Sequence, residues 1–146
     1  MAGKSALDYP FLRGDKIGPL WVRMLRDNVG ITQIQNLDKV PVPVDIHVAR
    51  ATLALGVVRG QYKGRLDNLF ETIRQVWFKS SAGLAVDDRH MIALDVDEPL
   101  WHLSRYGCTY RDKLTGDCTV YNRCEAKDFC IKGKVSIQNN FVELDT

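Results

Sequence analysis

The nine residues Val42-Pro-Val-Asp-Ile-His-Val-Ala-Arg50 carry the most informative pattern in the chain. Asp45 is a favourable N-cap, because its carboxylate can accept hydrogen bonds from the first backbone N–H groups of a helix. Gly56 is a favourable helix stop, so we predict a helix from Asp45 to about Leu55. Position alone does not separate two interpretations of Asp45, a simple cap and a catalytic carboxylate that the helix dipole keeps ionised.

Helical periodicity extends on both sides of this stretch. Apolar residues share one side of a predicted helix from Gly18 to about Asn28, and the clearest apolar stripe predicts a helix from about Leu66 to Lys79. A further helix is predicted from Glu98 to Tyr106, whereas Val135 and Ile137 alternate like a short strand. We therefore expect a mostly helical chain with a loop-rich C-terminal end.

Composition restricts the class of protein. The chain has 146 residues, of which 45% are hydrophobic and 26% charged, and this is typical of one globular domain rather than a disordered tail. The net charge of +2 excludes a purely electrostatic nucleic-acid binder. No run of 18 apolar residues predicts a membrane span, and the first residues lack the apolar region of a secretory signal. We expect a cytoplasmic protein without a membrane partner.

The cysteines are clustered rather than scattered. All four lie within 23 residues, at Cys108, Cys118, Cys124 and Cys130, which indicates that they act together as metal ligands or as disulfide pairs. A reducing compartment disfavours disulfides. Structural zinc usually shows Cys-x-x-Cys pairs, which the chain lacks, whereas iron–sulfur ligation tolerates four cysteines on a wrapped loop. We favour a [4Fe-4S] cluster, with zinc as the first alternative and disulfides or free thiols as the second.

A glycine turn precedes the first predicted helix. Gly14 and Gly18 bracket a turn whose backbone N–H groups can hold a phosphate against the helix N-terminus, although a plain connector is the alternative. Positive charge lies nearby, and Arg50 is a further phosphate-binding candidate or the partner of a surface acid. The candidate DNA-binding residues are Arg13, Gly14, Lys16, Gly18, Arg23 and Arg50.

In combination these features resemble the helix-hairpin-helix DNA glycosylases of the endonuclease III family, over about residues 10–130. The resemblance is carried by the glycine hairpin, by Val-Asp-x-His-Val-x-Arg at Val44–Arg50, and by Leu-Ser-Arg-Tyr-Gly-Cys at Leu103–Cys108. It implies an all-α fold, a hairpin that grips phosphates of double-stranded DNA, and a [4Fe-4S] loop held by the four cysteines. It also implies removal of a damaged or mispaired base flipped out of the duplex, with Asp45 as the catalytic carboxylate.

The chain departs from the family pattern at three places. Family members with lyase activity carry a Schiff-base lysine just after the second hairpin glycine. The nearest lysine here is Lys16, within the turn, so Lys16 is a displaced catalytic candidate. Hydrolysis by water is therefore expected instead of lyase chemistry. Of the cysteine intervals, only the five residues between Cys124 and Cys130 agree. Helices that precede the hairpin in the family are missing, which suggests a fragment or a subunit whose protein partner supplies them.

The predicted organisation has three parts. Residues 1–95 form a helix-hairpin-helix glycosylase-like region, residues 96–134 form the cluster segment, and residues 135–146 form a tail. Besides a base-excision glycosylase, the alternatives are a non-catalytic iron–sulfur DNA-binding module, a subunit that needs a partner, and a small metal-binding interaction protein.

Overall fold

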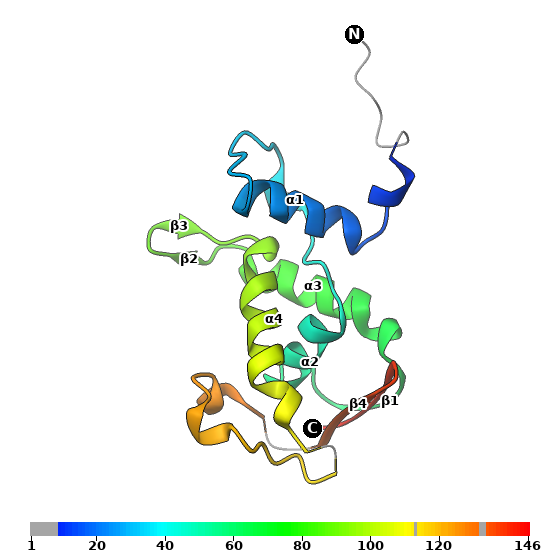
Figure 1. The fold of residues 1–146 in the computed structure, drawn as a ribbon. Coiled ribbons are helices and arrows are strands. Elements are labelled where there is room, and N and C mark those ends of the chain that lie inside the picture. The colour runs from blue at the N-terminus through cyan, green and yellow to red at the C-terminus, as the bar shows by residue number, and fades with distance from the viewer. Residues whose placement is uncertain (1–8, 113, 132–133) are drawn as a thin grey trace.

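Helix α2 (Ile46–Ala54) lies at the centre of the computed structural model, which describes residues 9–112, 114–131 and 134–146 (Figure 1). Asp45 caps this helix as predicted, since its Oδ1 accepts hydrogen bonds from the backbone N–H of His47 at 2.8 Å and of Val48 at 2.9 Å. Val48 and Leu53 are fully buried. The helix therefore anchors the core through its side chains and presents its capped start to one side.

The other three predicted helices are also confirmed. They are α1 (Ile17–Asp27), α3 (Phe70–Ser81) and α4 (Asp97–Tyr106). The apolar stripe that predicted a helix from residue 66 begins as a 3₁₀ turn, Leu66–Leu69, before α3 starts. Helix α4 packs against α2, α3 packs against the 3₁₀ turn Ala93–Val96 that precedes α4, and α1 lies over the end at which α4 begins (Figure 1).

The all-α prediction is wrong. Three antiparallel strands form a sheet in the order β1-β5-β4, from β1 (Gln61–Arg65), β4 (Lys134–Gln138) and β5 (Phe141–Asp145). The register pairs Tyr62 with Leu144, and Leu144 also with Val135. A second, two-stranded sheet consists of β2 (Ala85–Val86) and β3 (Arg89–His90).

The sheet closes the core opposite α1. Its inward-facing residues, Val135, Ile137, Val142 and Leu144, pack with the buried face of α2 in one hydrophobic cluster. The turn between β4 and β5 is Asn139-Asn140, and both residues have positive φ, as a two-residue type I′ hairpin turn requires. The strand predicted at residues 135–137 thus exists, as one arm of a hairpin that pairs with β1.

Gly56 joins the end of α2 to the cysteine-bearing segment. It follows the helix with φ +65°, and the nearby Ile131 N–H donates to the carbonyl of Ala54 at 3.0 Å. A Cβ at residue 56 would overlap the Ile131 side chain. The absent side chain therefore permits the left-handed backbone and also the close approach of Ile131.

We predict that Gly56→Ala destabilises the fold more than Gly30→Ala does. Both positions have positive φ, which costs an alanine about 1–2 kcal/mol, but a Cβ at Gly30 meets no atom within 4 Å. The overlap with Ile131 adds about 1–3 kcal/mol to the loss at Gly56. Denaturant unfolding measures both free energies, and equal losses would contradict the proposed contact.

Candidate functional site

A cavity of about 360 Å³ opens beside the capped start of α2, between α1 and α4. Its volume falls within the range of about 300–1,000 Å³ that is typical of small-molecule sites. The structure brings Asp45, Lys16 and Arg23, three of the residues predicted from sequence, to this one cavity. The lining residues share a polar or aromatic character for the most part and are Lys16, Leu20, Arg23, Pro43, Asp45, Asp97, Glu98, Trp101 and His102.

Asp45 is half-buried at the N-cap position of α2. Its carboxylate faces two backbone N–H donors and the positive end of the α2 dipole. The same geometry satisfies the cap and leaves the carboxyl group on the cavity wall. The two interpretations of Asp45 are therefore compatible in this structure.

Asp97 is a second carboxyl group in the cavity that sequence reasoning missed. It is the first residue of α4, its side chain is 8% exposed, and its Oδ2 lies 2.7 Å from Arg23 Nε. Burial raises the pKa of Asp97 to about 6, against the opposing charge of Arg23, and the nearby negative charge of Asp45 raises it further. Acidic residues are common in the first turn of any helix, so the sequence contained no signal that distinguished this one.

Arg23 is surrounded by carboxylates. Besides Asp97, its Nη1 lies 3.4 Å from Glu98 and 3.8 Å from Asp27. The structure therefore places this predicted DNA-binding residue inside an ion-pair network that also fastens α1 to α4.

The glycine turn is tight. The N–H of Gly18 donates to the carbonyl of Gly14 at 3.1 Å, and a Cβ at Gly18 would lie 2.6 Å from the carbonyl oxygen of Leu12. Arg13 and Lys16 are exposed on the same turn, and Lys16 also lines the Asp45 cavity. The predicted phosphate-binding residues Arg13, Gly14, Lys16 and Gly18 are thus gathered at one place.

Arg50 lies apart from that turn. Its Nη1 donates to Ser104 Oγ at 3.2 Å and to Thr109 Oγ1 at 3.0 Å, and burial lowers its pKa. His47 Nδ1 lies 3.2 Å from the same hydroxyl. Ser104 is fully buried, so His47 and Arg50 of the Val44–Arg50 motif meet on one residue of α4.

The four predicted ligand cysteines follow α4 on a segment of short 3₁₀ turns. Cys108, Cys118, Cys124 and Cys130 are all half-buried free thiols. Burial raises the pKa of Cys108 to about 12, and charges on the other three thiols raise it further, while Arg111 opposes the shift. Arg111 Nη2 lies 3.3 Å from Cys130 Sγ. Half-buried Arg111 thus lies beside Cys130 and opposes the raised pKa of Cys108.

Four cysteines in one segment supply the ligand type of a thiolate-ligated metal centre, and a bound metal together with Arg111 would supply the positive charge that ionised thiols require. In residues 9–112, 114–131 and 134–146, however, no group of three or more Cys, His, Asp or Glu side chains lies in an arrangement that could hold a metal ion. The metal-ligand set stays a prediction.

No protein-family model matches this chain, and neither does any curated protein or solved structure. Of the helices in the described part of the chain, none has the length and apolar character needed to cross a membrane.

The raised pKa of Asp97 predicts a pH-dependent effect of Asp97→Asn. The folded protein holds this proton more tightly than the unfolded chain, so the carboxyl group contributes stability at low pH that is lost between about pH 4 and pH 6. Relative to the wild type, the free energy of unfolding of Asp97→Asn should rise by about 2–3 kcal/mol from pH 4 to pH 7.

Asp67→Asn is the matched control, because Arg65 lowers the pKa of Asp67 to about 2, so its pH trend has the opposite sign and lies below about pH 4, with little change from pH 4 to pH 7. Denaturant unfolding at several pH values measures both trends. An Asp97→Asn difference that does not change with pH would contradict the assignment.

Proposed function

We propose that the protein binds double-stranded DNA and hydrolyses the N-glycosidic bond of a damaged or mispaired base. The observation that carries the proposal is the placement of Asp45, a carboxylate held by two backbone N–H groups on the wall of a cavity that also contains Lys16 from the glycine turn. The resemblance of Val44–Arg50 and Leu103–Cys108 to helix-hairpin-helix glycosylases supports the same conclusion.

Asp45 supplies the chemistry in this proposal. Cleavage of the bond between C1′ and the base nitrogen creates positive oxocarbenium character on the sugar, which a nearby carboxylate stabilises. Water then adds its oxygen to C1′, one proton goes to the departing base, and an abasic site remains. A base extruded from the duplex is needed for this reaction, because the bond is not accessible within the stack.

The glycine turn positions the strand. The exposed Arg13 and Lys16 provide positive charge that suits a phosphate. Arg50 has a positioning role, since its hydrogen bonds to Ser104 of α4 and to Thr109, just after α4, hold α2 in place. Asp45 is thereby fixed relative to the turn.

The four cysteines would hold a [4Fe-4S] cluster, with zinc as the less favoured metal. Cys108, Cys118, Cys124 and Cys130 would be the ligands, and such a centre would brace the segment that packs on the end of α4. A reducing cytoplasmic location suits unpaired thiols of this kind.

A protein partner would cover the outer face of α1. Ile17, Trp21 and Met24 are exposed along this helix, and the neighbouring Phe11 and Val29 are more exposed still. A row of large apolar side chains at helical spacing is typical of a helix that packs against another helix. Helices from a second chain are the proposed occupant.

A non-catalytic iron–sulfur DNA-binding module is the second candidate. The observation that favours it is the acidic character of the cavity, where Asp97 and Glu98 surround Arg23. Carboxylates repel phosphate groups, which disfavours entry of a nucleotide into this cavity but not contact of the exposed glycine turn with a duplex. Among the described residues, Lys16 is the lysine that lines the cavity, and it belongs to that turn.

Asp45→Asn separates these two candidates. Asparagine caps a helix as well as aspartate does, so the fold should be retained while the negative charge is lost. We predict that base release falls about 100-fold or more, with duplex affinity nearly unchanged. The measurement is cleavage at abasic sites in a panel of duplexes that carry uracil, mismatched thymine or an oxidised base.

Asp38→Asn is the control, since Asp38 is exposed on a distant 3₁₀ turn. Full activity of Asp45→Asn would remove Asp45 from the mechanism. Binding by the wild type without release of any base in the panel would favour the non-catalytic module.

The cysteine proposal predicts bound iron and sulfide in protein purified without oxygen. An absorbance band at about 400 nm that bleaches on reduction should accompany about four iron atoms per chain, and Cys108→Ser should lose both. Zinc instead of iron in elemental analysis would support the alternative metal. Metal-free wild-type protein that is fully folded would contradict the proposal.

A further inference from the structure

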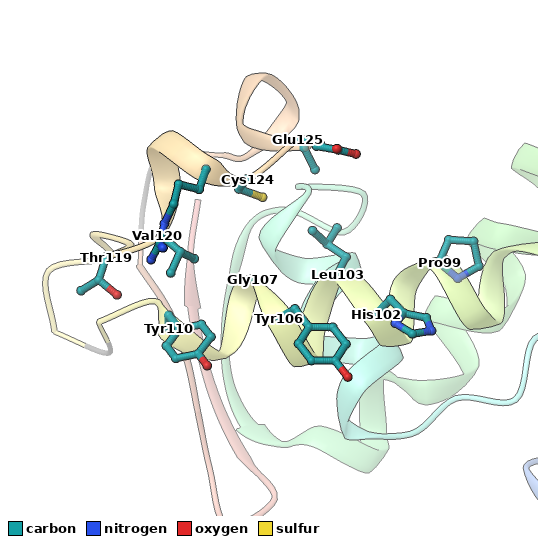
Figure 2. Close-up of a pocket in the computed structure, with 12 residues that line it drawn as sticks. Pro99, His102, Leu103, Tyr106, Gly107, Tyr110, Thr119, Val120, Cys124 and Glu125 are labelled. Carbon is teal, nitrogen blue, oxygen red and sulfur yellow. The ribbon is translucent and has the colours of Figure 1, made fainter.

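A second and larger cavity, of about 830 Å³, separates the C-terminal half of α4 from the cysteine segment (Figure 2). One wall consists of His102, Tyr106 and Tyr110, and the other includes Val120 and Arg123. This cavity is not part of the proposed cleavage site, which lies at the other end of α4. The proposed function leaves it without a role.

Aromatic rings form a continuous series along this side of α4. The ring centroids of His47 and Trp101 are 5.3 Å apart, those of Trp101 and His102 are 5.4 Å apart, and those of His102 and Tyr106 are 5.7 Å apart with nearly parallel planes. Tyr106 is 66% exposed. The series thus ends in a ring that is available to a flat ligand.

His102 connects the two cavities. It lines the large cavity and also the smaller one that contains Asp45. Trp101, which precedes it, lies in the smaller cavity and contacts His47. A strand that places one nucleotide beside Asp45 can therefore continue along α4 toward Tyr106.

The charges in the large cavity nearly balance. Arg123 and Glu125 both line it, and the His102 ring lies 3.7 Å from Glu98. The surrounding segment from residue 104 to residue 134 has a net charge of +3. Such a near balance favours contact with an uncharged heterocycle inside the cavity, and Arg123 is a lining residue that suits a neighbouring phosphate.

We propose that this cavity binds an unpaired nucleobase of DNA, stacked on Tyr106, next to the nucleotide that enters the Asp45 cavity. The identity of the ligand as DNA rests on the proposed function. Stacking on an aromatic ring is tolerant of base identity, because every base has a π-face. The site therefore holds displaced nucleotides without reading their sequence.

Binding of a short single-stranded thymidine oligomer to the full chain tests the inference. Fluorescence anisotropy should show that Tyr106→Ala weakens binding about five-fold or more, while Tyr106→Phe, which keeps the ring, stays within about two-fold of the wild type. Tyr121→Ala is the matched control, since Tyr121 is 45% exposed on the same segment but does not line the cavity. It should bind like the wild type.

An oligomer of the same length with abasic residues separates stacking from phosphate contacts. It should bind the wild type more weakly than the thymidine oligomer and should be insensitive to Tyr106→Ala. Equal binding of the two oligomers, wild-type affinity of Tyr106→Ala, or no binding of the thymidine oligomer would overturn the inference.

These outcomes are distinguishable from failure of the proposed function. Release of a base from duplex DNA together with Tyr106-independent oligomer binding would overturn only the stacking site. Tyr106-dependent oligomer binding without release of any base would overturn only the glycosylase proposal.

Discussion

Ion pairs hold helix α1 against the rest of the molecule. Its arginines reach nearly buried carboxylates, with Arg23 Nε 2.7 Å from Asp97 and Arg26 Nη1 2.9 Å from Asp95. None of the residues of α1 is fully buried, and Leu20, Val22 and Leu25 are half-buried, so the ion pairs add to a modest apolar contact. Losing one partner of such a pair leaves an uncompensated charge in a poorly hydrated place, which is strongly unfavourable.

This attachment determines the geometry of the candidate site. The glycine turn is continuous with α1, and Asp97 and Asp45 line the same cavity. The position of the turn over Asp45 is therefore set by the contact between Arg23 and Asp97. Asp45 is hydrogen-bonded at a helix start, whereas burial raises the pKa of Asp97, so the two carboxyl groups of this cavity have different surroundings.

Local patterns in the sequence predicted the helices, because apolar spacing, the Asp45 cap and the Gly56 stop are all contained within a few turns of chain. The sheet was not predicted, because Gln61–Arg65 has little apolar alternation and its partner strand lies some eighty residues away. Asn139-Asn140 is a hairpin signal within the sequence itself, because asparagine tolerates the positive φ that a two-residue turn needs. Of the site, Asp45, Lys16 and the glycine turn were anticipated, whereas Asp97 and the aromatic series on α4 required the fold to bring distant residues together.

The strand order β1-β5-β4 has a consequence for how the chain reaches its native state. The middle strand comes from Phe141–Asp145 and must dock beside Gln61–Arg65, so a large loop closes before the sheet exists. Contacts of such separation form slowly compared with helices. During synthesis, α2 and α3 would leave the ribosome with one side of their shared apolar core exposed to solvent. Burial of that side would have to wait for the strands at the C-terminal end.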